Sequence, residues 1–470
     1  MKYISTRGRA GGLPFDDVLL AGLAPDGGLF VPDAWPRFSA ADIGALKGMN
    51  YAEVAVRVMK PFIGGAIADE ALDAIAAETC RAFDHADIAP LKKIGDNEWL
   101  LELFHGPTLA FKDYAMQFLG RFFDHVLKER GRRVTIIGAT SGDTGSAAIE
   151  ACRGREALDV FIFHPQGRVS EVQRRQMTTV ADANIHNAAV RGTFDDCQAL
   201  VKAMFNDPAF RKRCRPAAVN SINWARIMAQ IVYYFRTVAE LSAEPGAADT
   251  GVSFAVPTGN FGNAFAGYAA KRCGLPVRRL MVGSNRNDIL TRFFASGAMQ
   301  TSAVHPTISP SMDIQVSSNF ERLLFDLCDR NGRAVAEIMD QFHATGHFDI
   351  APGRLAKARE FFSAARIDDA GTKAAIREIH EQTGELIDPH TAVGLAAGRT
   401  LRSSDAGPLV YIATAHPAKF PEAVEDATGV RPQLPARLAD LAERIERFDV
   451  LDNDIEAVKT YVSELVGEAR

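Results

Sequence analysis

Lys112 lies on the apolar face of an expected helix, and this face should be buried. In the stretch FHGPTLAFKDYAMQFLGRFF, apolar residues recur at helical spacing from Thr108 onward. The residues three, four and seven positions after Lys112 are all apolar, namely Ala115, Met116 and Leu119. Burial disfavours the charged form of an amine, so a buried lysine becomes a nucleophile suited to Schiff-base or acid–base chemistry. The alternative is that Lys112 extends its amine out of the apolar face to solvent.

Two glycine-rich turns are candidate phosphate sites. GATSGDTGSAA, residues 138–148, and PTGNFGNAF, residues 257–265, each follow an apolar strand and precede a helix, which we expect to begin near Ser146 in the first case. Glycine lets backbone amides approach an anion, and a helix N-terminus adds a favourable partial charge. Neither turn is a P-loop or a GxGxxG motif. Ordinary turn chemistry explains each one alone, but two at the same sheet edge favour a phosphorylated ligand.

Two further sets of polar residues are candidate ligand contacts. In VNSINWARIMAQIVYYF, Asn220 and Ser221 precede a helix, and Arg226 lies one turn into it. These residues suit either a second anion site or a helix cap followed by a solvated arginine. In YIATAHPAKF, Thr414 ends an apolar strand, where its hydroxyl either caps the chain or donates a hydrogen bond to a ligand ring.

The elements that must position these residues alternate between strand and helix. Six short apolar runs, each followed by a helical segment or a polar turn, are RVTIIGAT, LDVFIFHP, NIHNAAVRG, VSFAVPTG, RRLMVGSN and PLVYIATAH. Continuous apolar strands alternating with helices predict parallel sheets covered on both faces. Ligands bind at the carboxyl ends of such strands, where the polar turns described above are found.

The pattern predicts an α/β fold with two parallel-sheet, three-layer domains and an N-terminal α+β subdomain. We expect four segments: an N-terminal subdomain over residues 1–90, an α/β domain carrying Lys112 over 91–245, a second α/β domain carrying the 257–265 turn over 246–435, and a C-terminal helical tail over 436–470.

Composition excludes several classes of function. The chain has 470 residues, is 47% hydrophobic and 24% charged, and carries a net charge of -5, so no nucleic-acid footprint is expected. Six scattered cysteines form no CxxC metal or redox motif, which favours a reducing compartment. The N-terminus has no secretory signal, and no run approaches the roughly 20 apolar residues of a membrane span. These features predict a cytoplasmic globular protein without metal, membrane or nucleic-acid partners.

Pyridoxal phosphate supplies both an aldehyde for Lys112 and a phosphate for a glycine turn. The segments FHGPTLAFKDYA, GATSGDTGSAA, PTGNFGN, PSMDIQVSSNFERLLF and ATAHPAKF together resemble the threonine synthases of the longer bacterial and fungal type, as do MKYISTRG and APDGGLFVP near the N-terminus. The resemblance covers nearly the whole chain. It implies a tryptophan-synthase-like pyridoxal 5'-phosphate enzyme with the cofactor between two α/β domains.

The resemblance also implies a role for each candidate residue. Lys112 forms the Schiff base, and Thr414 faces the pyridine nitrogen. The cofactor phosphate is held by Gly259, Asn260, Phe261, Gly262 and Asn263. The substrate carboxylate and the face of the cofactor meet the turn formed by Ser141, Gly142, Asp143 and Thr144. The substrate phosphate is held by Asn220, Ser221 and Arg226. Shorter family members carry asparagine in place of Asp143. The PSMDI segment is typical of the longer type, and no individual roles are assigned to its residues.

The implied reaction converts O-phospho-L-homoserine and water to L-threonine and phosphate. Lys112 moves the protons, and three residues stabilise the departing phosphate: Arg226, Ser221 and Asn263. A pyridoxal phosphate-dependent serine or threonine dehydratase is the alternative enzyme, because it needs only one phosphate site. A non-catalytic relative that binds a phosphorylated metabolite is the alternative from another class.

Three histidines near the motifs are expected to be structural, namely His105, His390 and His416. The chain is either a monomer or a homodimer.

Overall fold

The computed structural model describes residues 1–403 and 407–468, which fold into two compact units. The first unit consists of Met1–Val18, Leu23–Phe111 and Ser221–Pro432. The second consists of Leu19–Gly22, Lys112–Asn220 and Gln433–Arg470. Both units are therefore built from segments that are distant in the sequence. Our division of the chain into four consecutive segments remains a prediction.

The first unit is organised around a six-stranded sheet. In spatial order its strands are β14 (Phe362–Arg366), β11 (Val277–Ser284), β10 (Val252–Pro257), β15 (Leu409–Ala413), β5 (Glu98–Glu102) and β4 (Leu91–Gly95). All neighbouring pairs are parallel except β4 with β5, which are antiparallel at one edge. Every residue of β10 and β15 is buried. These continuous apolar strands are central because both of their faces are covered.

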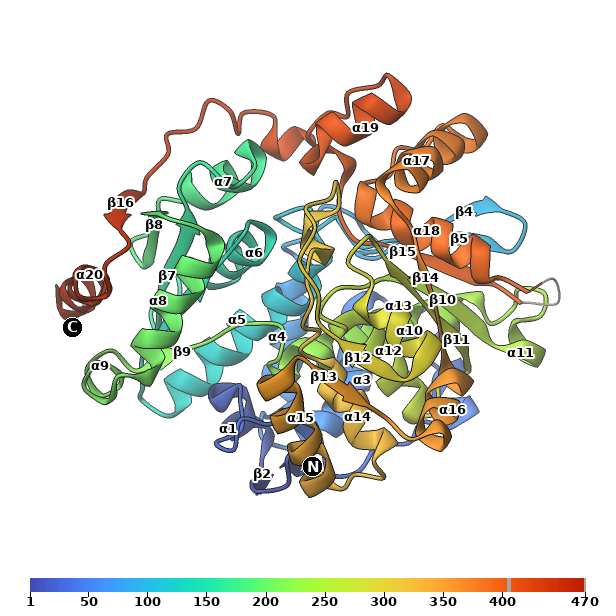
Figure 1. The fold of residues 1–470 in the computed structure, drawn as a ribbon, viewed down its shortest axis with the longest axis horizontal. Coiled ribbons are helices and arrows are strands. Elements are labelled where there is room, and N and C mark those ends of the chain that lie inside the picture. Colours follow the sequence, from blue (N-terminus) through green and yellow to red (C-terminus); the bar gives the residue numbers. More distant parts are fainter. Residues whose placement is uncertain (404–406, 469–470) are drawn as a thin grey trace. The chain divides into compact units, whose positions relative to one another are not determined.

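Helices cover this sheet on two faces (Figure 1). One face carries α17 (Asp369–Thr383) and α18 (Pro389–Leu401), and the other carries α10 (Trp224–Leu241), α12 (Gly262–Arg272) and α13 (Ile289–Ser296). The remaining elements of this part are α11 (Ala247–Thr250), β12 (Ala298–Gln300), η1 (Pro310–Met312), α14 (Phe320–Leu327), α15 (Gly332–Thr345), β13 (His347–Asp349), α16 (Pro352–Phe361), η2 (Pro417–Lys419) and α19 (Pro421–Thr428).

The N-terminal region adds a small antiparallel sheet and helices. Its elements are β1 (Tyr3–Ser5), β2 (Gly11–Leu13), α1 (Phe15–Ala21), β3 (Phe30–Pro32), α2 (Ala40–Gly44), α3 (Tyr51–Ile63) and α4 (Asp69–Cys80). Capping boxes begin α2 at Ser39 and α3 at Asn50, and Gly64 ends α3 in the left-handed conformation. The apolar face of α3 packs on α10 and α4, so this region extends the core of the first unit.

The second unit contains a five-stranded sheet. Its strands, in spatial order, are β16 (Asp449–Asp452), β8 (Ile185–Arg191), β7 (Leu158–Pro165), β6 (Val134–Ala139) and β9 (Pro216–Ala217). All of its neighbouring strands are parallel. The eight residues of β7 are all buried. The run LDVFIFHP, which the sequence predicts as a buried strand, occupies the same residues as β7.

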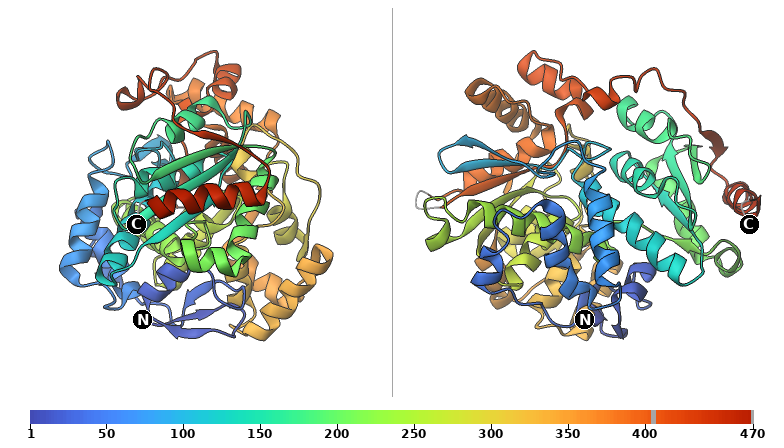
Figure 2. Two further views of the ribbon diagram at one scale, coloured as in Figure 1. Left: turned by 90° about the vertical axis from the view of Figure 1, so that its left-hand side faces the viewer. Right: turned by 180° about the vertical axis from the view of Figure 1, so that it is seen from behind.

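Helices from two separate segments of this unit's sequence cover its sheet. α8 (Phe194–Asn206), α9 (Pro208–Cys214) and α20 (Ile455–Glu468) share a buried apolar cluster with β6, β7 and β8. Figure 2 (left) shows α20, in red, beside α8 and α9 over the sheet. The other helices of the unit are α5 (Lys112–Glu129), α6 (Asp143–Cys152), α7 (Glu171–Thr178) and the short η3 (Ala436–Leu438).

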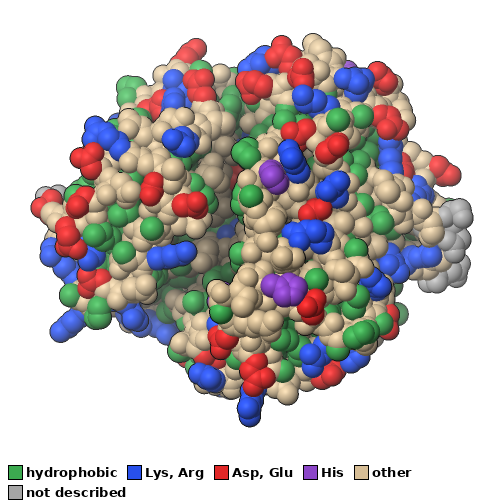
Figure 3. All heavy atoms as spheres, viewed as in Figure 1, with side chains coloured by type: hydrophobic (Ala, Val, Ile, Leu, Met, Phe, Trp, Pro, Cys, Tyr) green, Lys and Arg blue, Asp and Glu red, His purple; other side chains and the backbone are tan. Residues whose placement is uncertain are grey.

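The mixed α/β fold with parallel sheets confirms the predicted fold class. The tail predicted as helical from residue 436 contains a strand as well, because β16 pairs with β8 before α20 begins. Acidic and basic side chains are interspersed over the face of the molecule drawn in Figure 3. Within the described residues, no helix is both long enough and apolar enough to cross a membrane.

Candidate functional site

Lys112 is the first residue of α5. The sequence predicts this helix from Thr108, and that start is wrong. Leu109 has φ = 62°, which is not a helical conformation, and Ala110 forms an antiparallel bridge with Ala415. The backbone of Leu109 and Ala110 is therefore not part of the helix. The side chain of Lys112 is 13% exposed. The helix therefore begins with a largely buried lysine, as its apolar neighbours indicate.

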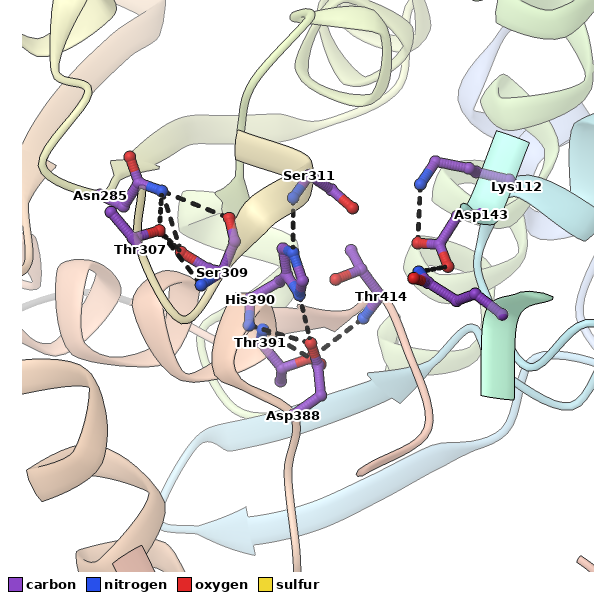
Figure 4. Close-up of polar contacts among 11 residues, drawn as sticks. Lys112, Asp143, Asn285, Thr307, Ser309, Ser311, Asp388, His390, Thr391 and Thr414 are labelled. Atoms are coloured by element: carbon purple, nitrogen blue, oxygen red, sulfur yellow. Dashed lines mark hydrogen bonds and ion pairs between the residues drawn. The ribbon is translucent and has the colours of Figure 1, made fainter. Parts of the chain in front are cut away.

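The amine of Lys112 is paired with a buried carboxylate. Its Nζ donates to Oδ2 of Asp143 at 2.8 Å, as Figure 4 shows. The other carboxylate oxygen, Oδ1, accepts a hydrogen bond of 2.8 Å from Nε2 of Gln173 on α7. The side chain of Asp143 is 5% exposed. Of the residues predicted for this turn, Asp143 is thus brought directly to Lys112.

The turn before α6 is fixed by its own hydroxyl group and by close packing. Oγ1 of Thr140 accepts hydrogen bonds from the N–H groups of Gly142 and Gly145, at 3.0 and 2.9 Å. Gly142 has φ = 145°, and a Cβ there would lie 2.5 Å from the side chain of Gln173. The helix begins at Asp143, three residues earlier than predicted, because these bonds cap its first turn.

The flanks of this turn are more open than its centre. Ser141 is exposed and Thr144 is half-buried.

In the first unit, the predicted phosphate turn leads from β10 into α12. Phe261 has φ = 63° and directly precedes the helix, and no side chain caps its N-terminus. Oδ1 of Asn263 accepts hydrogen bonds of 2.8 Å from the hydroxyl groups of Tyr233 and Tyr234 on α10. Nδ2 of Asn263 is buried and has no hydrogen-bond partner among the described residues. The two tyrosines therefore orient this amide so that its donor end is available.

Arg226 is buried on α10, with 4% of its surface exposed. Burial lowers its pKa to about 10. The cap of this helix is Asn223, whose Oδ1 accepts from the N–H of Ala225 at 3.0 Å, and not Asn220 or Ser221. The interpretation of Arg226 as a solvated arginine is therefore wrong. Of the two residues before the cap, Asn220 is exposed and Ser221 is half-buried.

Asn319 links two of the predicted anion-binding segments. Its Nδ2 donates to the carbonyl oxygens of Ser221 and Asn260, at 3.2 and 3.1 Å. Its Oδ1 in turn accepts from the fully buried guanidinium of Arg322, which also donates to the carbonyl of Phe30 at 3.0 Å. This network brings the backbone of Ser221 and the 257–265 turn together. Sequence reasoning missed it, because Asn319 and Arg322 lie about 60 to 290 positions from the segments that they join.

Thr414 follows β15 and is held through its backbone. Its N–H donates to Oγ1 of Thr391 at 3.0 Å, and its carbonyl accepts from the N–H of Phe111 at 2.8 Å. The residue is 6% exposed. Its side chain is therefore carried on a backbone fixed from both sides.

Hydrogen bonds assign structural contacts to the three histidines. Nε2 of His105 lies 2.8 Å from Oε2 of Glu102, and Nδ1 of His416 accepts from the N–H of Ala418 at 3.2 Å. His390 lies between Asp388 and the backbone of Ser311. The structural role expected for each histidine stays a prediction.

Three family models match successive parts of the chain. They are described as threonine synthase N terminus (residues 2–80), pyridoxal-phosphate dependent enzyme (residues 86–342) and threonine synthase, C-terminal (residues 391–462). The threonine synthase of Pseudomonas aeruginosa is 57% identical over 465 residues, which cover 99% of this chain and 98% of that protein. The chain belongs to the threonine synthase family of pyridoxal-phosphate-dependent enzymes.

Solved structures of threonine synthases share the fold. The pyridoxal phosphate-bound enzyme from Brucella melitensis matches with a TM-score of 0.96 and 52% identity, and the yeast enzyme with 0.93 and 36%. Each match covers 99% of this chain and 99% of the other. The predicted cofactor, pyridoxal 5'-phosphate, and the enzyme class, a pyridoxal phosphate-dependent lyase, are thereby confirmed.

Taken unit by unit, the residues predicted to hold the cofactor have the chemistry that a phosphate-bearing aldehyde needs. The uncapped start of α12 and the buried Nδ2 of Asn263 are donors that an anion would satisfy. A Cβ on Gly259 would lie 3.0 Å from the carbonyl oxygen of Ser311, which is tighter than most Cβ contacts, so a larger residue there would require the backbone at Ser311 to move by a few tenths of an ångström. Lys112 supplies the primary amine that an aldehyde requires.

Proposed function

We propose that this chain converts O-phospho-L-homoserine and water to L-threonine and phosphate. The buried position of Arg226 is the observation that supports this specific reaction, in addition to the family assignment. A dehydratase needs one anion site, for the cofactor phosphate, whereas this reaction needs a second for the substrate phosphate. A guanidinium that is 4% exposed, on the helix whose tyrosines orient Asn263, supports that second site.

Each candidate residue then has a role toward the cofactor. Lys112 would bind its aldehyde carbon, and Thr414 would present a neutral hydroxyl to its ring nitrogen. The phosphate would be held by Gly259, Asn260, Phe261, Gly262 and Asn263. When bound, the cofactor supplies a conjugated ring that accepts the electron pair left on the substrate when a proton is removed.

The remaining candidate residues would bind and orient the substrate. We assign the substrate carboxylate to the turn formed by Ser141, Gly142, Asp143 and Thr144. We assign the substrate phosphate to Asn220, Ser221 and Arg226. The guanidinium of Arg226 would stabilise the phosphate as it leaves the γ-carbon, because charge grows on the bridging oxygen in that step.

Proton transfers fall to Lys112. Its Nζ would take one proton from the substrate α-carbon and one from the β-carbon. After phosphate has left, one proton would return to the γ-carbon, and once water has added at the β-carbon, one would return to the α-carbon. Asp143 would hold that Nζ at one position, since its second oxygen is itself fixed by Gln173. One amine in a fixed position is then able to serve successive proton transfers.

The test is a product assay on the purified, cofactor-loaded protein. Incubation with O-phospho-L-homoserine should release phosphate and threonine in equal amounts. Release of 2-oxobutyrate in place of threonine would indicate a dehydratase-type lyase. Binding without phosphate release would indicate a non-catalytic relative.

Two variants make the assay specific to the site. Lys112→Ala should abolish threonine formation. Lys128→Ala, which removes a 54% exposed lysine from the same helix, should not. Arg226→Lys should raise KM for the substrate and weaken inhibition by inorganic phosphate, because lysine keeps the charge but loses the two-pronged geometry. Unchanged phosphate inhibition would remove Arg226 from the substrate site.

Two finer predictions remain open. Monomer and homodimer are both retained, and light scattering during size-exclusion chromatography decides between them. The cytoplasmic location expected from the sequence also remains a prediction.

A further inference from the structure

The segment from Pro310 to Asn319, which contains the PSMDI motif, lies against the turn that precedes α12. Oγ of Ser317 donates to the carbonyl of Gly259 at 2.7 Å, and the N–H of Asn319 donates to the carbonyl of Asn260 at 3.1 Å. At the other end of the segment, the carbonyl oxygen of Ser311 is the atom that a Cβ on Gly259 would approach. The segment therefore contacts Gly259 near both of its ends and Asn260 at its C-terminal end.

A buried histidine holds the centre of the short helical turn η1 in this segment. The N–H of Ser311 donates to Nε2 of His390 at 3.1 Å. Because Nε2 accepts this bond, the ring proton lies on Nδ1, which donates to Oδ2 of Asp388 at 2.7 Å. His390 is 4% exposed and Asp388 is fully buried. A backbone N–H thus selects the tautomer, and the carboxylate fixes the ring.

The same carboxylate also supports Thr414. Oδ1 of Asp388 accepts from the hydroxyl of Thr391, whose Oγ1 accepts from the N–H of Thr414 at 3.0 Å. Figure 4 shows His390 and Thr391 converging on Asp388, with Ser311 and Thr414 at the two ends of the network. One buried carboxylate therefore reaches both the PSMDI turn and the residue after β15.

The flanks of the turn have a separate support. Nδ2 of Asn285 donates to Oγ of Ser309 at 3.0 Å and to Oδ1 of Asp313 at 2.8 Å. The hydroxyl of Thr307 donates to the same oxygen of Asp313 at 2.7 Å. These bonds do not involve His390. A change at His390 should therefore release the centre of the turn while its ends stay in place.

We infer that Asp388 and His390 are positioning residues for the cofactor. His390 holds the PSMDI turn over Gly259 and so sets the shape of the phosphate turn. Asp388 acts through Thr391 to hold Thr414 at the ring nitrogen. The inference rests on the proposed function, because it takes the turn formed by Gly259–Asn263 as the cofactor-phosphate site. It assigns to the PSMDI motif a role in selecting the phosphorylated cofactor.

The test compares pyridoxal phosphate with pyridoxal, which lacks the phosphate. Full-length protein is stripped of cofactor and titrated with each compound, and visible absorbance reports binding. His390→Asn keeps a donor for Asp388 but cannot reach the N–H of Ser311. We expect its affinity for pyridoxal phosphate to fall about tenfold, with its affinity for pyridoxal unchanged. His390→Gln, whose Oε1 can accept from Ser311, should restore most of the preference.

Two further variants separate the arms of the network. Ser317→Ala should also lower the preference for pyridoxal phosphate, and its matched control is Ser302→Ala, at an exposed serine of the preceding loop. Thr391→Val should weaken binding of both compounds equally and shift the absorbance maximum of the bound cofactor, because its arm reaches the ring and not the phosphate. Thermal unfolding of each stripped variant identifies any that is misfolded.

The inference is overturned if His390→Asn and Ser317→Ala leave the ratio of the two affinities unchanged, or if His390→Asn weakens both compounds equally. A loss in His390→Gln as large as in His390→Asn would also overturn it. The proposed function fails differently. If the parent protein prefers pyridoxal phosphate in these titrations but forms no threonine from O-phospho-L-homoserine, that function is wrong while the positioning role stands.

Discussion

Nζ of Lys112 and Oδ2 of Asp143 lie 2.8 Å apart, in a pair whose side chains are 13% and 5% exposed. The second oxygen of Asp143 accepts from the amide nitrogen of Gln173. Lys112 and Gln173 are thus both donors to this carboxylate. An asparagine, which shorter members of the family carry here, would turn its own donor nitrogen toward one of them. Because Gln173 and Lys112 both donate, the side chain at position 143 must accept at both of its polar atoms, which a carboxylate does.

Asp143→Asn should be strongly destabilising here. Its amide nitrogen would face either the ammonium of Lys112 or the amide nitrogen of Gln173, and the buried charge of Lys112 would lose this negatively charged partner. Removing one partner of a buried ion pair costs about 3–5 kcal/mol. We expect the free energy of unfolding of the cofactor-free protein, measured by urea denaturation, to fall by about 3 kcal/mol.

The matched variant is Asp143→Asn combined with Gln173→Glu. The new carboxylate accepts from the asparagine nitrogen, so the asparagine oxygen is free to accept from Lys112. Part of the lost stability should return. If the single variant is as stable as the parent, or the double variant is less stable than the single one, the two-donor arrangement around Asp143 does not explain its identity.

Gly142→Ala should displace Gln173 from Asp143. A Cβ at Gly142 would lie 2.5 Å from the side chain of Gln173, and φ = 145° is strained for any other residue. Backbone strain of this kind costs about 1–3 kcal/mol, and the clash adds to it. The measurement is the free energy of unfolding, together with the rate of phosphate release. Gly167→Ala is the control for strain without a clash. Gly167 has φ = 68°, and a Cβ added there would meet no atom within 4 Å apart from its chain neighbours, so this variant should lose less stability.

Local patterns predicted the elements better than their ends. β7 occupies the predicted residues because all eight side chains are buried, and a continuous apolar run signals this state directly. The start of α5 was misplaced by four residues, because the bridge between Ala110 and Ala415 joins positions about 300 residues apart. No local pattern encodes such a partner.

The same limit applies to the candidate site. Lys112 and Gly259 stand out because an amine on an apolar face and a glycine between strand and helix are local signals. Gln173 and Asn319 do not, since each acts through a contact with a distant segment. Asp388 carries a cap signal, as its position before Pro389 shows, but its bond to His390 was not predicted. Residues that hold other site residues are thus the ones that sequence reasoning misses.

Glu446→Gln should loosen the C-terminal segment from α7. Arg174 donates to both carboxylate oxygens of Glu446, at 2.8 and 2.9 Å, and the hydroxyl of Thr178 donates to one of them at 2.7 Å. Although burial acts to raise its pKa, the hydrogen bonds from Arg174 and Thr178 hold the pKa of Glu446 below its ordinary value. Its contribution to stability is therefore present near neutral pH and lost as the pH falls through the lowered value.

Charge-assisted hydrogen bonds contribute about 1.5–3 kcal/mol, and the partial exposure of this pair reduces that figure. We expect faster proteolysis of the segment around residues 436–448 in Glu446→Gln. The rate of phosphate release should also fall, by a smaller factor than the rate of proteolysis rises, because α7 also carries Gln173. Glu443→Gln, at an exposed glutamate of the same segment, is the control. Equal proteolysis of the two variants would show that Glu446 does not hold the segment.

His164 should make the second unit less stable in mild acid. Burial, together with the positive charge of Arg174, lowers the pKa of His164 from 6.5 to about 4. Between these values the unfolded chain binds a proton that the folded chain does not. Stability from this group is therefore complete above about pH 6.5 and falls by about 3 kcal/mol as the pH drops to about 4, below which it changes no further.

His164→Phe removes the titrating group and keeps a ring against Phe448, whose centroid lies 6.1 Å from that of His164. The free energies of unfolding of both proteins are measured by urea denaturation from about pH 7.5 to about pH 4. The stability of the variant relative to the parent should rise by about 3 kcal/mol across this range, because all other groups titrate alike in both proteins. A constant difference would mean that His164 is not held neutral in the folded protein.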